Sequence, residues 1–131
     1  MVAVDPSSAA AQRPPVWIGH VGPLVVADLS ESIAFYERLG LRPGFHHDGM
    51  ASMELRGGTH LVLVEDTDVA PGHEAPFDLM VDDLPQTQKR LAAASIGSTP
   101  IERSGAHERF WITDPSGHRI RVHDSHVVGV V

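Results

Sequence analysis

Apolar and polar residues along the chain follow an order of strand, helix and three strands that occurs twice. In the first half, residues 17–26 are mostly β-branched and apolar, which favours a buried strand. The stretch "DLSESIAFYERLG" (28–40) then places apolar side chains at helical spacing, namely Ile33, Tyr36 and Leu39, with Phe35 beside them. Three shorter strand patterns follow, and Asp48-Gly49 between the first two predicts a hairpin.

The second half repeats this order. The stretch "FDLMVDDLP" (77–85) predicts a strand, "QTQKRLAAAS" a helix, and three short strand patterns end near residue 124. The stretches "VVADL" (25–29) and "MVDDL" (80–84) both pass from a strand into a helix, which indicates an internal repeat.

The ends of both helices carry recognisable residues. Ser30 is the expected N-cap of the first helix, and Gly40 is its expected stop. Pro85 suits the first turn of the second helix, which Gly97 is expected to end.

The repeat predicts an α+β fold of two tandem βαβββ modules. We place the modules at residues 16–65 and 76–124, joined by the Pro- and Gly-rich linker 66–75. Each helix is expected to cover one face of its sheet and to leave the other face open to line a cavity. Residues 1–15 predict a flexible leader to the single domain 16–131, and the role of the apolar tail 125–131 is open.

Composition narrows the classes of function. The net charge is −7 and no run of Lys or Arg occurs, which argues against a nucleic-acid partner. No stretch approaches the roughly 20 apolar residues that a membrane span needs. The absence of cysteine excludes thiolate catalysis and cysteine-ligated zinc. The first 15 residues lack the pattern of a secretory signal, so we expect a cytoplasmic protein.

Two motifs carry a family resemblance. "GHVGPLVVADLSESIAFYERLGL" (19–41) and "DPSGHRIRVH" (114–123) resemble the opening strand and helix, and the closing strand, of the vicinal oxygen chelate superfamily. That group includes glyoxalase I, bleomycin- and fosfomycin-resistance proteins and extradiol dioxygenases. The resemblance implies that the curved sheets form a cup-shaped mixed sheet with the helices on its outer face. In metal-dependent members, His, Glu or Gln residues on the first and last strands of the modules hold a divalent ion.

The metal positions of the resembling family are poorly matched in this chain. Val21 stands at the family's first-strand histidine, although a bulge at Gly22-Pro23 would bring neighbouring His20 into the cup. Arg121 stands at the family's closing glutamate, and a guanidinium has no lone pair for a metal. The second module's first-strand position falls on Ala75 or Pro76. We therefore expect no metal and no cofactor. The alternative is a divalent ion such as Zn, Fe, Ni or Mn, held by His20, His60 and His123.

Strand parity selects the residues that should face the cavity and bind a ligand. They are His60, Val62, Asp78, Met80, Arg109, Trp111, Arg121 and His123, with Glu54 or His47 as further candidates. Arginines suit a carboxylate or phosphate, and tryptophan suits an aromatic ring or a cation. The structural alternatives are an internal ion pair of Arg121 with Asp78 or Glu54, and Trp111 in the core. His118 and the His46-His47 pair are expected in solvent.

Three functions remain open at this level. The first is a metal-free, homodimeric protein that sequesters or recognises a small aromatic or anionic ligand in the cup. The second is a metal-dependent or acid–base lyase, isomerase or dioxygenase, with the three-histidine cluster or with His123 and Asp78 as catalytic residues. The third is a structural partner module. Neither the ligand nor the pairing of modules, within one chain or between two, follows from the sequence.

Overall fold

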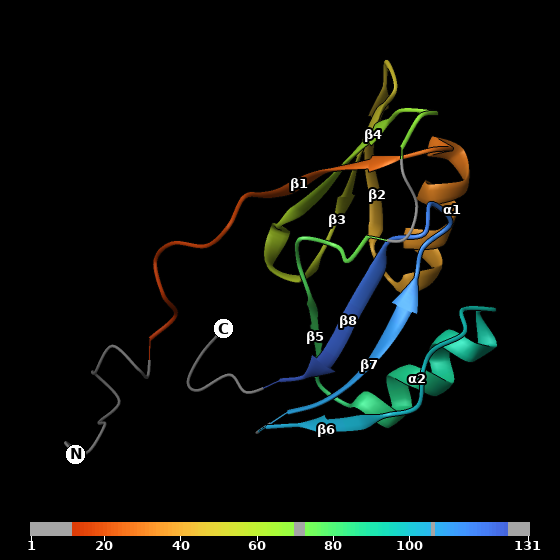
Figure 1. Cartoon of the computed structure of the whole chain (residues 1–131). Coiled ribbons are helices and arrows are strands. Elements are labelled where there is room, and N and C mark those ends of the chain that lie inside the picture. Colours follow the sequence, from red (N-terminus) through yellow and green to blue (C-terminus); the bar gives the residue numbers. More distant parts are fainter. Residues whose placement is uncertain (1–11, 70–72, 106, 126–131) are drawn as a thin grey trace.

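The structure, a computed structural model, describes residues 12–69, 73–105 and 107–125. It contains two four-stranded mixed sheets, each accompanied by one long helix (Figure 1). Most of the expected leader 1–15, three residues of the expected linker 66–75 and nearly all of the tail 125–131 lie outside the described residues. No helix among the described residues is long and apolar enough to cross a membrane.

The first module has the expected βαβββ order. Its elements are β1 (His20–Val26), α1 (Leu29–Leu39), β2 (Arg42–His47), β3 (Met50–Glu54), a short 3₁₀ turn η2 (Arg56–Gly58) and β4 (His60–Glu65). The strand order in the sheet is β1-β4-β3-β2, with β1 parallel to β4 and the other neighbours antiparallel. The β2–β3 hairpin turns at Asp48-Gly49, where both residues have positive φ, as a two-residue type I′ turn requires.

The second module repeats this topology. Its elements are β5 (Leu79–Val81), α2 (Leu84–Ala93), β6 (Glu102–Ser104), β7 (His107–Thr113) and β8 (Arg119–Asp124). The strand order is β5-β8-β7-β6, again with the outer pair β5 and β8 parallel. The predicted fold class of two βαβββ modules with open, cup-like sheets is therefore confirmed.

The caps of the two helices differ from those expected. Asp28, not Ser30, caps α1, because its side chain accepts a hydrogen bond from Glu31 N at 3.0 Å. Gly40 ends α1 as expected, with a φ of 126°. Helix α2 ends at Ala93, before Gly97, because Ser95 takes a positive φ of 63° and the chain then turns to bury Ile96.

The end of the linker is more ordered than its composition indicates. Glu74 forms an isolated parallel bridge with Arg119, and Ala75 N donates to Arg119 O at 2.7 Å. Arg119 N in turn donates to His73 O at 2.8 Å. These bonds satisfy backbone groups at the start of β8, and Ala75 becomes buried in the core.

Buried apolar residues of both modules form one hydrophobic cluster, and the turn before β8 joins the modules. Tyr36 Oη on α1 donates to Asp114 Oδ2 at 2.8 Å, and Ala27 N donates to Ser116 Oγ at 2.9 Å. His118 Nε2 lies 2.6 Å from the carbonyl oxygen of Val25 at the end of β1. The expectation that His118 lies in solvent is wrong: its exposed fraction is 6%, because the whole turn packs against the first module.

Candidate functional site

The open face of the second sheet gathers most of the residues chosen by strand parity. The β5–β8 register pairs Met80 with His123, and the β7–β8 register pairs Arg109 with His123 and Trp111 with Arg121. Paired residues on neighbouring strands point to the same side of a sheet. Asp78 lies two residues before Met80 and contacts two of the β8 side chains of this face. The side chains on the opposite face of the sheet are buried, since Ile120 and Val122 of β8 are at most 1% exposed.

Trp111 lies among three guanidinium groups. The Cζ atoms of Arg109, Arg119 and Arg121 are 5.7, 5.9 and 5.8 Å from its ring centroid. Trp111 is half-buried, so it does not lie in the core, which was the alternative that the sequence left open. We call this group of four side chains the arginine–tryptophan face.

Carboxylates neutralise two of these three arginines. Arg109 Nε donates to Glu102 Oε1 at 3.0 Å, and Arg121 donates to Asp78 Oδ2 at 3.3 Å. Arg119, at the start of β8, makes no ion pair within the described residues and is exposed. The Arg121 Nε atom is buried and has no hydrogen-bond partner within the described residues. The face therefore retains positive charge and one unsatisfied donor, which suits an anionic group.

His123 lies deeper in this face than its neighbours. Its side chain is 12% exposed, and its Nε2 is 3.3 Å from Asp78 Oδ1. Its Nδ1 is 3.0 Å from the backbone oxygen of Asp124. Asp78 therefore bridges Arg121 and His123, so the internal ion pair that the sequence left open is present.

The open face of the first sheet forms a separate hollow of about 310 Å³. It is lined by His20, Phe45, Met50, Ala51, Ser52, His60 and Val62. The register between β1 and β4 shifts between Val21 and Leu24, as the suggested bulge requires, and sets His20 opposite His60 with ring centroids 6.0 Å apart. His60 Nε2 is 3.6 Å from Glu54 Oε2, and Arg42 pairs with the other oxygen of this carboxylate, Oε1. His46 and His47 are exposed, as expected.

The residues at the positions of the resembling family's metal ligands do not fit a divalent ion. Arg121 offers only donors and is already paired with Asp78, and Val21 and the buried Ala75 have no ligand atom. The alternative triad is also not assembled within one chain. The described residues contain no group of three ligands that joins His20, His60 and His123.

Two residues that the sequence analysis did not select lie close to His123. His107 begins β7 and Asp124 ends β8, and with His123 they form the one group of three metal-ligating side chains among the described residues. Strand alternation could have predicted that His107 lies on this face, because it is two residues before Arg109 and four before Trp111 on the same strand. Asp124 has the opposite parity to His123 and reaches the group only because β8 ends there.

Two further hollows lie in the second half of the chain. Besides the first-sheet hollow, one hollow is lined by Glu74–Asp78 and Arg121, and another by residues 97–99, 111–113 and 119. None of these three hollows is lined by both modules, and the one at Glu74–Asp78 includes the end of the linker.

The fold consists of two βαβββ modules, each with an open polar sheet face, as the sequence motifs predicted. The chain belongs to the Glyoxalase/Bleomycin resistance protein/Dioxygenase superfamily, whose sequence profile matches residues 17–122. No curated protein sequence is significantly similar to the chain.

Solved structures support the same fold. The chain is 23% identical to lactoylglutathione lyase from Agrobacterium tumefaciens, with 86% of this chain and 96% of that chain covered and a TM-score of 0.68. It is 19% identical to an integron cassette protein from the mobile metagenome of the Halifax Harbour sewage outfall, with 83% and 98% covered and a TM-score of 0.73. It is 23% identical to a glyoxalase/bleomycin resistance protein from Catenulispora acidiphila, with 83% and 96% covered and a TM-score of 0.65. At these identities the likeness shows the fold alone.

Proposed function

We propose that this protein binds a small cytoplasmic ligand that carries an aromatic ring and an anionic group, and that it sequesters or recognises this ligand without chemistry. The observation that carries the proposal is the arginine–tryptophan face, where three guanidinium groups surround one half-buried indole ring. An indole face provides stacking area for an aromatic ring, and guanidinium groups bind carboxylate or phosphate in bidentate geometry. Each part of the ligand thus has a matching group on the same sheet face.

The first experiment measures binding at this face. Benzoate, indole-3-acetate and phenyl phosphate are added to the full chain, and the melting temperature is recorded with and without divalent metals. We expect at least one of them to raise the melting temperature, because a ligand that binds only the folded state stabilises it. Trp111→Ala should abolish the shift. Arg121→Gln should weaken affinity by about 10-fold or more, since a charge-assisted hydrogen bond contributes roughly 1.5–3 kcal/mol.

Trp17→Phe is the matched control, because Trp17 is the other tryptophan of the chain, is 68% exposed and lies outside the arginine–tryptophan face. It also leaves Trp111 as the single tryptophan, so quenching of tryptophan fluorescence by a ligand reports on Trp111 directly. If no probe of this class shifts the melting temperature, or if Trp111→Ala keeps the shift, the proposal is wrong.

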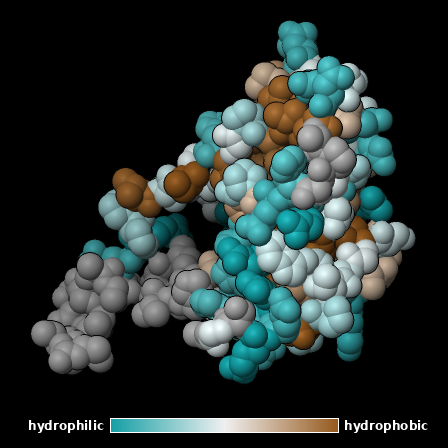
Figure 2. Space-filling view, viewed as in Figure 1, coloured by the Kyte–Doolittle hydropathy of each residue, from teal (hydrophilic) through white to brown (hydrophobic). Residues whose placement is uncertain are grey.

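We further propose that the protein is a homodimer in which the arginine–tryptophan face of one protomer meets the His20–His60 hollow of the other. The separate hollows on the two modules support this arrangement, because each is half of a cup. A dimer would also bury apolar surface that is exposed in the single chain. Figure 2 shows such surface along the segment that leads into β1. The large apolar residues that are exposed in the single chain are Val16, Trp17, Ile18, Phe45, Met50 and Met80.

A mixing experiment tests the shared cup. Light scattering should give twice the mass of the chain. Trp111→Ala and His60→Ala should each weaken ligand binding as pure dimers, because each damages both cups. A refolded equal mixture should recover about a quarter of the wild-type sites, since half of its dimers are mixed and each holds one intact cup. A monomer, or a mixture without recovery, contradicts the shared cup.

Acid–base catalysis by His123 with Asp78 is the second candidate function, and their 3.3 Å contact favours it. A neighbouring carboxylate orients an imidazole for proton transfer near neutral pH. If a bound ligand is turned over, His123→Gln should lower kcat with little change in affinity. If the ligand binds but is not turned over, catalysis is excluded and only the binding function stands.

A further inference from the structure

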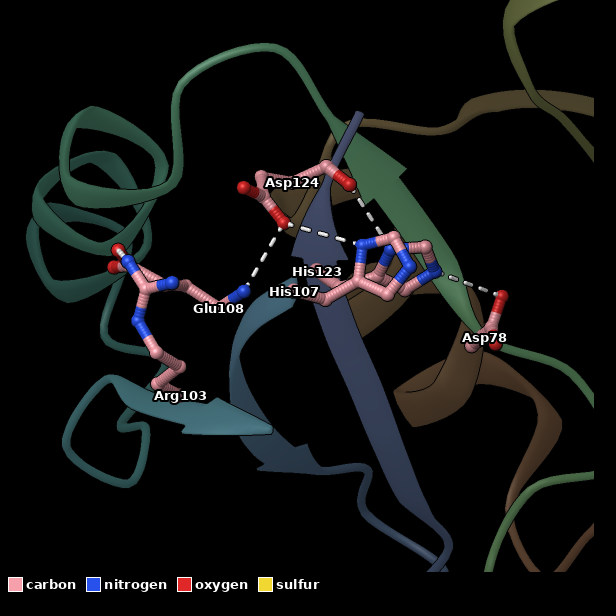
Figure 3. Close-up of polar contacts among 6 residues, drawn as sticks. All are labelled: Asp78, Arg103, His107, Glu108, His123 and Asp124. Atoms are coloured by element: carbon pink, nitrogen blue, oxygen red, sulfur yellow. Dashed lines mark hydrogen bonds and ion pairs between the residues drawn. The ribbon is translucent and has the colours of Figure 1, made fainter. Parts of the chain in front are cut away.

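The group formed by His107, His123 and Asp124 has the donor chemistry of a metal site. Two imidazoles and one carboxylate offer ligand atoms that all lie within 4.8 Å of one another. Figure 3 shows the two imidazole rings lying together, with the Asp124 carboxylate directed at His107 and with Asp78 beyond His123. The ring centroids of the two histidines are 5.3 Å apart.

The spacing is close to that of a bound ion. His107 Nδ1 and Asp124 Oδ1 are 3.7 Å apart. Two ligands of a tetrahedral Zn²⁺ are about 3.4 Å apart, because the metal–ligand bonds are about 2.0–2.1 Å. Small side-chain rotations therefore bring the group to coordination distance.

Hydrogen bonds already orient two of the three ligands. His123 has an acceptor at each ring nitrogen: the Asp124 backbone oxygen at 3.0 Å from Nδ1 and Asp78 Oδ1 at 3.3 Å from Nε2. A neutral imidazole carries one N–H, so it can donate to only one of these oxygens. An ion on one nitrogen would leave the other to donate, which is the arrangement that orients metal-bound histidines. Asp124 Oδ1 also accepts a hydrogen bond from Glu108 N at 3.2 Å.

The charge and exposure of the group also favour a cation. Asp124 and Asp78 place two carboxylates around the imidazoles, and Asp78 already offsets Arg121. The side chains of His107 and Asp124 are 37% and 41% exposed, so an ion would reach them from solvent and keep positions for water. Imidazole and carboxylate together suit divalent ions of the late first transition series.

We propose that His107, His123 and Asp124 bind one divalent transition-metal ion such as Zn²⁺, and that Asp78 positions His123 from the far side of its ring. This site lies where β7 begins and β8 ends, and it uses none of the positions at which the resembling family holds its metal. It is independent of the ligand proposed for the arginine–tryptophan face, because it is tested with metal alone.

The test is Zn²⁺ titration of the full chain, free of any affinity tag and stripped of metal with a chelator. Calorimetry should show one Zn²⁺ per chain, and Co²⁺ should give the visible absorption bands of a histidine–carboxylate site. His107→Ala and Asp124→Asn should each weaken Zn²⁺ affinity by about 100-fold or more, because removing an outer partner alone typically costs 10–100-fold. Asp78→Asn should weaken it by about 10-fold and change the Co²⁺ bands only slightly.

His47→Ala is the matched control. His47 Nε2 is 2.9 Å from Asp48 Oδ2, in an exposed His–Asp pair that lacks a third ligand among the described residues. It should leave the stoichiometry and affinity unchanged. Thermal unfolding of each metal-stripped variant checks the fold. Because His107 and Asp124 are only partly buried, their variants keep the test valid if His123→Ala does not fold.

Two results overturn the proposal. One is the absence of 1:1 binding, or affinity that is unchanged in both His107→Ala and Asp124→Asn, which would mean adventitious binding by surface imidazoles. The other is binding that is lost in His20→Ala or His60→Ala but kept in His107→Ala, which would instead support the three-histidine alternative.

Discussion

At the scale of single residues, His118 shows how far a side chain's role depends on a partner remote in sequence. Its place after a turn predicts solvent exposure, yet it is 6% exposed and its Nε2 lies 2.6 Å from the carbonyl oxygen of Val25. The imidazole must donate to this carbonyl, so the tautomer with a proton on Nε2 is required. His118 therefore ties β8 to the end of β1.

His118→Ala should lower the free energy of unfolding by about 2 to 3 kcal/mol, because it leaves a cavity and an unpaired carbonyl. Urea denaturation followed by circular dichroism measures this. His46→Ala is the control, since His46 is exposed on β2, and it should change stability by less than about 0.5 kcal/mol. Equal effects of the two substitutions would contradict the assigned role of His118.

At the scale of elements, the bulge in β1 decides which side chains the first sheet presents. Gly22 has a φ of 104° where the register between β1 and β4 shifts. A Cβ there would lie 2.7 Å from Leu24 N and 2.9 Å from Val62 O, and both are backbone atoms that cannot move aside. The bulge therefore depends on glycine, and the bulge sets His20 opposite His60.

Gly22→Ala should destabilise the protein by about 1 to 3 kcal/mol, through backbone strain and this close contact. It should also disturb the His20 and His60 resonances in NMR spectra. Gly19→Ala is the control, because a Cβ at Gly19 meets nothing within 4 Å. If Gly22→Ala matches Gly19→Ala in its denaturation midpoint, β1 tolerates a side chain at the bulge and the account is wrong.

At the scale of the whole molecule, the hydrogen bond between Tyr36 and Asp114 couples the two modules. Burial, then the charge of Asp114 and its hydrogen bond, raise the pKa of Tyr36 above its ordinary value of 10.0. The folded protein therefore keeps the phenol protonated where the unfolded chain ionises it. This contribution to stability is full below about pH 10 and is lost progressively as the pH rises above it.

Tyr36→Phe should lower stability at neutral pH by about 1 to 3 kcal/mol, because Asp114 loses a donor. The difference in the free energy of unfolding between wild type and variant should become smaller above about pH 10. Only the wild-type unfolded state is stabilised there, because only it has a phenol that ionises. Tyr36 is the single tyrosine of the chain, so tyrosinate absorbance reports on it alone. Tyrosinate that forms near pH 10 while the fold is intact would contradict this account.

Much of this architecture could be read from local pattern. Alternation along β7 and β8 placed Arg109, Trp111, Arg121 and His123 on one face, because strand periodicity is a property of the backbone. The Asp-Leu steps into both helices and the glycine after α1 marked the element ends to within a residue or two. The exchange of Ser30 for Asp28 as the cap is an error of the same local kind, since both side chains can cap a helix.

Contacts between remote segments could not be read in this way. Periodicity assigns a face to each strand, but it does not specify how two sheets dock or which turn is buried between them. The docking of Asp114–His118 on the first module, the approach of the linker end to Arg119, and the meeting of His107 with Asp124 at two strand ends all depend on that packing.

The sequence by itself determined the two βαβββ modules, their family and the polar residues of the open faces, because hydrophobic period and motif spacing act over short stretches of chain. Tertiary structure decided that Arg121 is paired with Asp78 and that His107 lies beside His123 and Asp124. These outcomes depend on distances between side chains of different strands, which only the packing of the strands and their connecting turns sets.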